Sequence, residues 1–384
     1  MRILMISGRA DFGGGPEHVY QLSKALAGRT EVYIACPREE PYWERFSQVA
    51  GAKHMLEIPH RSLSFSALRA MVNLIRAEKI DIVHTHGRTA GVYGRIAALL
   101  AGKPCIHTAH GGKPVENLKT FGFAIAEYLL SFITRKVIAV SSTELKVLQK
   151  LCPQRDKLHV ITNGAQIPKS VATPEVRLQK PLRVIHSTRF EYQKRTVMLV
   201  DIMLTLRQTG VLNQFKFVIL GDGPDRVEFE TKLRENSLQD SVEFVGAVRN
   251  PGDYLREAFC LISASRWEGL PLVVLESMAR GLPVVATDVM GNRDAVTHET
   301  TGFLYDASTP SDAAGHLTRL AHDSDLWKTF SQNARNRAVQ EYSVEVMADA
   351  TLALYQTISK TRTSAAKQTC TIPPGLPAPA LTRG

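Results

Sequence analysis

Long apolar runs, paired cysteines and an acidic excess are all missing from this sequence of 384 residues. No stretch of about 18 apolar residues is free of charge, so no membrane-spanning helix is predicted. The five cysteines have no C-x-x-C spacing, which argues against a zinc site or a disulfide framework and favours a reducing cytoplasm. The apolar residues at the start are too few for a signal peptide, so we expect the mature protein to begin at Met1.

The net charge of +10 is unevenly distributed along the chain. Residues 1–165 contain 22 Lys and Arg against 13 Asp and Glu, residues 166–359 contain 21 against 24, and residues 360–384 contain 4 against none. A basic first half favours an anionic partner, either acidic lipid at a membrane surface or a phosphate-bearing acceptor. A merely solubilising basic face is the equally weighted alternative.

Short apolar strands alternate with helical patterns through both halves of the chain. This alternation predicts an α/β fold of two Rossmann-like domains with parallel sheets, each long enough to bury its own core. We expect the first domain at residues 1–165, a proline-containing linker at 166–181 and the second domain at 182–344. A helix at 345–359 is expected to return to the first domain, and residues 360–384, with four prolines, are expected to be disordered.

Two glutamates, Glu268 and Glu276, enclose a short apolar segment that contains Pro271. Proline favours the start of a helix, and the free amides of a helix N-terminus bind phosphate or sugar hydroxyls. Carboxylates eight positions apart across such a junction can accept hydroxyl hydrogen bonds from a sugar and from a ribose. Taken alone, the pair is more typical of a helix-dipole residue and a solvated helix face.

The neighbouring motifs favour a binding site instead. Arg189 and Lys194 follow a predicted strand at 182–187, and cations so placed can bind a diphosphate. The turn at residues 221–224, with sequence Gly-Asp-Gly-Pro, follows a strand at 215–220 and brings backbone amides within reach of a ligand. Because ligands bind at the carboxyl edge of a parallel sheet, we expect these loops to converge.

The first domain has its own candidate residues at strand ends. The loop with Gly14 and Gly15 follows the first strand and can approach a phosphate across an interdomain cleft. His84 and His86, followed by Arg88, end another strand and are candidates for an acceptor pocket. Two histidines without a carboxylate or a third histidine nearby make a poor metal site, so we predict no metal.

Taken in order, these motifs resemble those of glycosyltransferase family 4, whose members have the GT-B fold of two facing Rossmann-like domains. The resemblance extends from Met1 to about Ser359 and includes the glycine-rich loop, Arg-x4-Lys, Gly-Asp-Gly-Pro, the Phe-Val-Gly that contains Val245, and the glutamate pair. One departure is Arg195, which follows Lys194 where the family usually has glycine.

The resemblance implies a role for each candidate. Arg189 and Lys194 would bind the donor diphosphate and stabilise the leaving nucleotide, Glu268 would contact the donor sugar, and Glu276 the ribose. His110, in Thr-Ala-His-Gly, would lie beside the reacting sugar. The implied catalytic set is His110, Glu268, Arg189 and Lys194. The implied donor-binding set is Gly14, Gly15, Arg189, Lys194, Gly221, Gly223, Val245, Glu268, Gly269, Leu270, Leu272 and Glu276.

The implied reaction is retaining transfer of a hexose or N-acetylhexosamine without metal or cofactor. UDP-sugar is the first choice of donor and GDP-mannose the second. The acceptor would be a glycan or a polyprenyl-diphosphate-linked sugar of bacterial O-antigen, capsule or exopolysaccharide synthesis, and no nucleic acid partner is expected. The location would be cytoplasmic, with peripheral contact to an anionic inner membrane face suggested by the apolar segment 115–136 and its flanking cations. A buried helix is the plainer interpretation of that segment.

Three alternatives share parts of this pattern. A nucleotide-sugar 2-epimerase has the same fold, and a non-catalytic protein could bind the same nucleotide sugar. A dinucleotide oxidoreductase is disfavoured because G-x-G-x-x-G is missing. Asp323 and Asp325 have the Asp-x-Asp spacing of a metal-binding motif, but their polar surroundings predict a helix cap.

Overall fold

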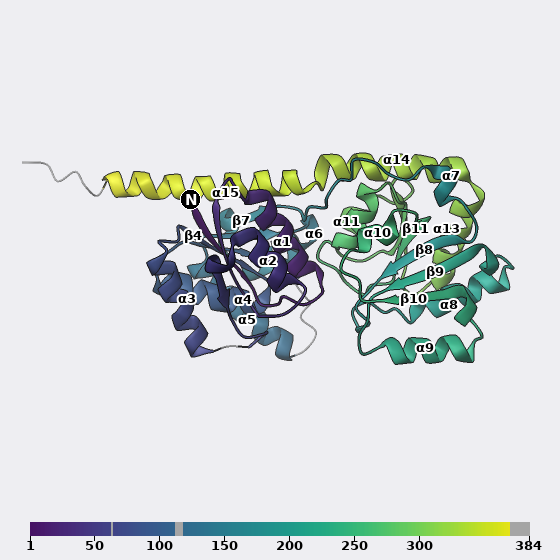
Figure 1. Cartoon of the computed structure of the whole chain (residues 1–384), viewed down its shortest axis with the longest axis horizontal. Helices are drawn as coiled ribbons and strands as arrows, with labels where there is room; N and C mark the ends of the chain where they lie inside the picture. Colours follow the sequence, from purple (N-terminus) through teal and green to yellow (C-terminus); the bar gives the residue numbers. More distant parts are fainter. Residues whose placement is uncertain (63, 112–117, 369–384) are drawn as a thin grey trace, which may run out of the picture.

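The computed structural model describes residues 1–62, 64–111 and 118–368, without the side chains of 118–121 and 360–368. Figure 1 shows two lobes side by side, joined along one side by the last two helices. Each lobe contains one parallel sheet, which confirms the predicted α/β architecture. In the described residues, no helix is both long and apolar enough to cross a membrane.

The first domain contains a seven-stranded sheet in the order β3-β2-β1-β4-β5-β6-β7. Its strands are β1 (Arg2–Ser7), β2 (Glu31–Cys36), β3 (Met55–Glu57), β4 (Ile82–His86), β5 (Cys105–Thr108), β6 (Lys136–Ala139) and β7 (Leu158–Val160). Its α-helices are α1 (Gly14–Leu26), α2 (Tyr42–Ala50), α3 (Phe65–Ala77), α4 (Arg88–Leu100), α5 (Leu118–Ile133) and α6 (Ser142–Leu151).

The second domain contains a six-stranded sheet in the order β10-β9-β8-β11-β12-β13. Its strands are β8 (Leu182–Ser187), β9 (Phe215–Leu220), β10 (Val242–Gly246), β11 (Cys260–Ser263), β12 (Val284–Thr287) and β13 (Gly302–Tyr305). Its α-helices are α8 (Met198–Gln208), α9 (Arg226–Glu235), α10 (Pro251–Leu255), α11 (Leu272–Ala279), α12 (Asn292–Ala295), α13 (Pro310–His322) and α14 (Ser324–Glu341).

Strand β1 explains why helices cover both faces of the first sheet. Ile3 and Met5 belong to the core formed with α1 and the C-terminal helix, whereas Leu4 and Ile6 belong to the core formed with α3 and α4. Successive side chains of a strand point to opposite faces, so an apolar run without polar interruption requires a cover on each side.

The C-terminal helix α15 (Val344–Gln368) packs on the first domain, as predicted. Its Tyr355 hydroxyl lies 2.6 Å from Nδ1 of His84 in the first sheet. The helix was predicted to end at residue 359, and the structure corrects this because α15 continues to Gln368. The rest of the tail predicted to be disordered, 369–384, lies outside the described residues.

The predicted linker contains one short helix, α7 (Pro174–Arg177), and is fixed to the second domain. The buried Arg177 guanidinium donates hydrogen bonds to the backbone carbonyls of Arg256 and Gly281. The predicted capping role of Asp323 is confirmed, because its carboxylate accepts a hydrogen bond from the Leu326 amide at 2.8 Å.

Candidate functional site

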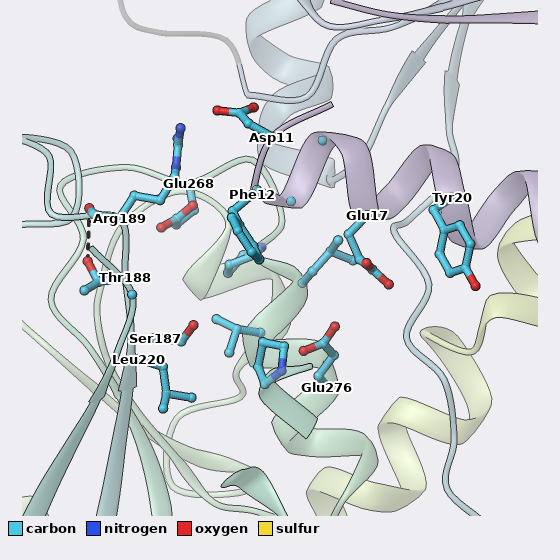
Figure 2. A pocket seen from close by; sticks show the side chains of 18 of the residues that line it. Asp11, Phe12, Glu17, Tyr20, Ser187, Thr188, Arg189, Leu220, Glu268 and Glu276 are labelled. Carbon is cyan, nitrogen blue, oxygen red and sulfur yellow. Dashed lines mark hydrogen bonds between the residues drawn. The ribbon is translucent and has the colours of Figure 1, made fainter. Parts of the chain in front are cut away.

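A cavity of about 1040 Å³ lies between the two domains, and we call it the interdomain cavity. Figure 2 shows its two walls, with Asp11, Phe12, Glu17 and Tyr20 on one side and Arg189, Glu268 and Glu276 on the other. The first wall is formed by the loop after β1 and the start of α1. The second is formed by the loops after β8, β9 and β11 and by the N-terminus of α11, so carboxyl edges of both sheets face one cavity.

Two glycines bring the domains together at the floor of the interdomain cavity. A Cβ atom on Gly269 would lie 3.0 Å from the backbone nitrogen of Gly111. Gly111 has a φ of +94°, a conformation that side chains other than glycine rarely adopt. A larger residue at either position would push the domains apart, so this pair sets the distance between His110 and the second domain.

An ion pair occupies the second wall. Lys194 Nζ lies 2.6 Å from Glu268 Oε1, and the same oxygen accepts a hydrogen bond from Ser265 at 2.6 Å. Glu268 is buried, so its charge is paired and hydrogen-bonded as a buried carboxylate requires. Both residues line the interdomain cavity and therefore present one positive and one negative group to a ligand.

Cations from both domains approach one another near Arg189. Burial lowers the pKa of the Arg189 guanidinium, and the positive charges of Arg9 and Arg61 lower it further. Glu191, at 3.2 Å, opposes this effect. Asp11, which pairs with Arg9 at 2.6 Å, opposes it as well. Arg binds phosphate in a bidentate manner, so Arg189 on the cavity wall suits an anionic ligand.

The Gly-Asp-Gly turn after β9 is pressed against the loop after β8. A Cβ atom on Gly221 would lie 1.7 Å from the carbonyl oxygen of Thr188, and one on Gly223 would lie 2.8 Å from that of Phe190. Their φ angles are +127° and +151°. Only glycine fits here, and both residues line the interdomain cavity.

Glu276 faces Glu17 of the first domain across the interdomain cavity (Figure 2). Burial raises the pKa of the Glu276 carboxyl to about 7, with a further increase from the Glu17 charge, while Arg280 and Arg45 oppose the shift. Glu17 is itself held by the Tyr42 hydroxyl at 2.6 Å and by Arg45 at 2.8 Å.

Replacing Glu276 by glutamine is expected to raise the melting temperature at pH 8 by a few degrees and to leave it nearly unchanged at pH 5. The pKa of Glu276 is about 7 when folded, against 4.5 for the free group, so the folded protein binds more protons between these values and loses stability as pH rises. Thermal denaturation at both pH values measures this, with exposed Glu345→Gln as the control. A lower melting temperature for Glu276→Gln at pH 8 would contradict the account.

The histidines predicted in the first domain have different positions. His110 lines the interdomain cavity, as does Arg88. His84 and His86 are buried and are not among the described residues that line it. The two ring nitrogens of His84 lie 2.6 Å from the Tyr355 hydroxyl and 2.8 Å from the Thr108 hydroxyl, so His84 is a structural residue here and not a contact for an acceptor.

The other predicted donor-site residues, with one exception, line the interdomain cavity. The exception is Val245 of β10, since the cavity is lined instead by the residues just after this strand, 247–251. The residues brought together as predicted are Gly14, Gly15, Arg189, Lys194, Gly221, Gly223, Glu268, Gly269, Leu270, Leu272 and Glu276.

Sequence reasoning missed His18, on the first turns of α1. Nitrogen atoms of His18, His86 and His110 all lie within 4.8 Å of one another. The prediction that the first-domain histidines lack a third partner is therefore wrong. Little in the sequence pointed to His18. It lies four residues after Gly14 on a helix, and only the packing of that helix on the sheet brings it close to the ends of β4 and β5.

Two family models match the chain. "Glycosyltransferase Family 4" matches residues 12–167, and "Glycosyl transferases group 1" matches residues 173–337. Among curated proteins, an Escherichia coli UDP-Gal:alpha-D-GlcNAc-diphosphoundecaprenol alpha-1,3-galactosyltransferase is 27% identical over 75% of this chain and 78% of its own length. The E. coli O-antigen biosynthesis glycosyltransferase WbnH is 24% identical over 87% of this chain and 94% of its own.

Solved structures agree on the fold. Anabaena HepE in complex with UDP and glucose has a TM-score of 0.80 and 20% identity, and the alignment covers 95% of this chain and all of that one. The lipopolysaccharide outer core galactosyltransferase WaaB has a TM-score of 0.67 and 22% identity, over 93% of this chain and all of that one. The two lobes have the GT-B arrangement, and the two family models between them match both domains. The chain belongs to glycosyltransferase family 4.

Proposed function

We propose that the protein transfers a hexose or N-acetylhexosamine from a UDP-sugar to a polyprenyl-diphosphate-linked sugar with retention of configuration, as part of bacterial cell-surface polysaccharide synthesis. The observation that supports this best is the second wall of the interdomain cavity. It presents the cations Arg189 and Lys194 and the carboxylates Glu268 and Glu276 around the N-terminus of α11. This combination suits a diphosphate flanked by two groups with hydroxyls.

Lys194 has a defined task in this reaction. Its ammonium forms an ion pair with Glu268 at 2.6 Å. A donor diphosphate would compete for Lys194, and the freed Glu268 oxygen would accept hydrogen bonds from the donor sugar. The ammonium and the Arg189 guanidinium would then stabilise the charge that develops on the leaving UDP, which is where electrostatic catalysis contributes most.

Names of the relatives support the choice of donor and acceptor. The E. coli galactosyltransferase is named for UDP-galactose and a diphosphoundecaprenol acceptor, and HepE was solved with UDP. We therefore rank UDP-sugars above GDP-mannose as donors. Membership of a glycosyltransferase family argues against the epimerase and the non-catalytic alternatives.

A lipid-linked acceptor lies at a membrane, and helix α5 offers a surface for it. Its side chains Phe123, Ile125, Leu129 and Phe132 are exposed, which contradicts the plainer interpretation of this segment as a buried helix. Arg135 and Lys136 follow shortly after the helix, beyond Thr134. Apolar side chains beside cations suit the surface of an anionic membrane, so we propose peripheral association at its cytoplasmic face.

Replacing both Leu129 and Phe132 by glutamate is expected to reduce sedimentation with acidic-lipid vesicles at least fivefold, because two apolar contacts become like charges. Leu129 and Phe132 are 60% and 52% exposed, so the fold should persist. Val227→Glu, at a 71% exposed position on α9 of the second domain, is the matched control. Equal sedimentation of the double variant and the control would show that α5 does not contact the membrane.

The proposed reaction is tested by incubating the protein with UDP-galactose, UDP-glucose, UDP-N-acetylglucosamine or GDP-mannose and a short polyprenyl-diphosphate-linked N-acetylglucosamine. We expect one UDP-sugar to give an extended lipid-linked disaccharide with an α linkage, assigned by NMR. An altered sugar that stays on the nucleotide would indicate an epimerase. Donor binding without turnover on this and other lipid-linked acceptors would contradict the proposed transfer.

A further inference from the structure

Three histidines from three elements meet behind the first wall of the interdomain cavity. His18 lies on α1, His86 ends β4 and His110 follows β5. The rings of His18 and His110 meet edge to face with centroids 4.4 Å apart, and the His86 and His110 rings are stacked at 5.5 Å. One nitrogen of each ring lies within 4.8 Å of the others. We call these residues the three-histidine cluster.

The cluster is buried, and some of its ring nitrogens form no hydrogen bond with the described residues. Among the described residues, neither ring nitrogen of His18 has a hydrogen-bond partner, although His18 is only 4% exposed. Nε2 of His86 also lacks a partner in this part of the chain, while its Nδ1 lies 3.2 Å from Nε2 of His110. Buried polar atoms are almost always paired, because leaving one unpaired costs about 1–3 kcal/mol. The unpaired nitrogens of these two neighbouring rings therefore require an explanation.

Imidazole binds a metal ion through a ring nitrogen. Neutral imidazole has one nitrogen lone pair free for this, whereas imidazolium has none. Each of the three rings offers one such nitrogen to the cluster.

We propose that His18, His86 and His110 form a binding site for a divalent transition-metal ion of the Zn²⁺ class. Imidazole nitrogen suits Zn²⁺ and its neighbours in the first transition row, whereas Mg²⁺ and Ca²⁺ prefer oxygen. Three protein ligands leave one tetrahedral position open. His110 lines the interdomain cavity, so this open position would face the cavity and be filled by water.

Closing the site requires a small movement. With Zn–N bonds of about 2.0–2.1 Å, tetrahedral ligand atoms lie about 3.4 Å apart, so nitrogens now spread over as much as 4.8 Å must draw in. Side-chain rotation of His18 would supply part of this movement, because its ring nitrogens accept or donate no hydrogen bond among the described residues.

Asn163 is placed to support the bound form. Its Oδ1 is buried and has no hydrogen-bond partner in the described part of the chain, while its amide nitrogen is fixed by a 2.7 Å hydrogen bond to the carbonyl of Leu270. The Asn163 side chain lies close to the His18 ring. Histidine ligands usually donate their second N–H to a carbonyl oxygen, and Oδ1 of Asn163 supplies one for His18.

Occupation of the site would have a consequence for catalysis, and this part rests on the proposed function. A metal ion would take the lone pair of His110 and place a positive charge beside the donor sugar. We therefore expect micromolar Zn²⁺ to inhibit transfer reversibly, with activity restored by a chelator.

The site is tested with Co²⁺ as the probe, added to the full chain without an affinity tag. We expect one ion per chain and the strong visible absorption of four-coordinate Co²⁺, which Zn²⁺ then displaces. His18→Gln should weaken Co²⁺ binding at least tenfold, and His322→Ala, at an exposed position on α13, should leave it unchanged. A folded His18→Gln variant, verified by its melting temperature, makes the comparison valid.

Equal Co²⁺ affinity in the wild type and His18→Gln, or only the weak absorption of six-coordinate Co²⁺, would overturn the proposal. Asn163→Ala gives a second measurement and should weaken binding about tenfold through loss of the support to His18. Because absorption reports the metal alone, failure of the proposed transfer reaction would not affect this result, and failure of the metal site would leave the transfer reaction intact.

Discussion

Replacing Lys194 by alanine is expected to lower kcat for sugar transfer by about 10³-fold, which is the loss seen when one charge-stabilising donor is removed from a transition state. Lys194 lies at the wall of the interdomain cavity with its ammonium 2.6 Å from Glu268. The substitution also leaves the buried Glu268 with only Ser265 as a hydrogen-bond donor among the contacts that the structure describes. Steady-state kinetics with the preferred donor measure the effect.

Lys232→Ala is the matched control, because this lysine on α9 pairs with an exposed Glu228 at 3.6 Å away from the interdomain cavity. Surface ion pairs contribute little, so kcat should change less than twofold. A Lys194→Ala enzyme that retains more than a tenth of the wild-type kcat would show that the diphosphate is stabilised elsewhere.

Replacing Gly221 by alanine is expected to lower the stability of the second domain by at least 3 kcal/mol, or to prevent folding. The new Cβ would lie 1.7 Å from the carbonyl oxygen of Thr188, and the φ of +127° is itself unfavourable for alanine. Thermal denaturation of the purified variant measures the loss, and nucleotide binding should fall with it because this turn lines the interdomain cavity.

Gly210→Ala separates the effect of the clash with Thr188 from the effect of the positive φ. Gly210 also has a positive φ, +76°, but no atom of the described residues lies within 4 Å of the position its Cβ would take. Its alanine variant should lose only about 1–2 kcal/mol, the cost of the left-handed conformation alone. Similar losses in the two variants would mean that the clash with Thr188 is relieved by movement of the loop.

The two-domain α/β fold was predictable because its signals are local. A run of apolar residues such as that of β1 needs no knowledge of its neighbours to be recognised as a buried strand. Elements as short as the three-residue β3 are too brief to carry such a signal. Their formation depends on contacts with residues far along the chain, which override weak local preference.

The second-domain site was predicted more completely than the first. Arg189, Lys194 and Glu268 follow recognisable strands and Glu276 lies on the helix after them, and the carboxyl-edge rule brings these residues together. His84 and His86 obey the same rule but point to a face of the sheet that α15 and α1 cover. One of these helices, α15, returns to the first domain from the end of the chain. Its Tyr355, which contacts His84, lies 271 residues later in the sequence, so no local pattern could predict this cover.

Binding of UDP to the metal-free protein, measured by isothermal titration calorimetry, tests the account most directly. We predict one UDP per chain with a Kd of about 1–100 µM, in the usual range for substrates, and at least tenfold weaker binding to Glu276→Ala at pH 8. No measurable heat with UDP or GDP, or equal UDP affinity in the wild type and Glu276→Ala, would contradict the assignment of the interdomain cavity as the donor site.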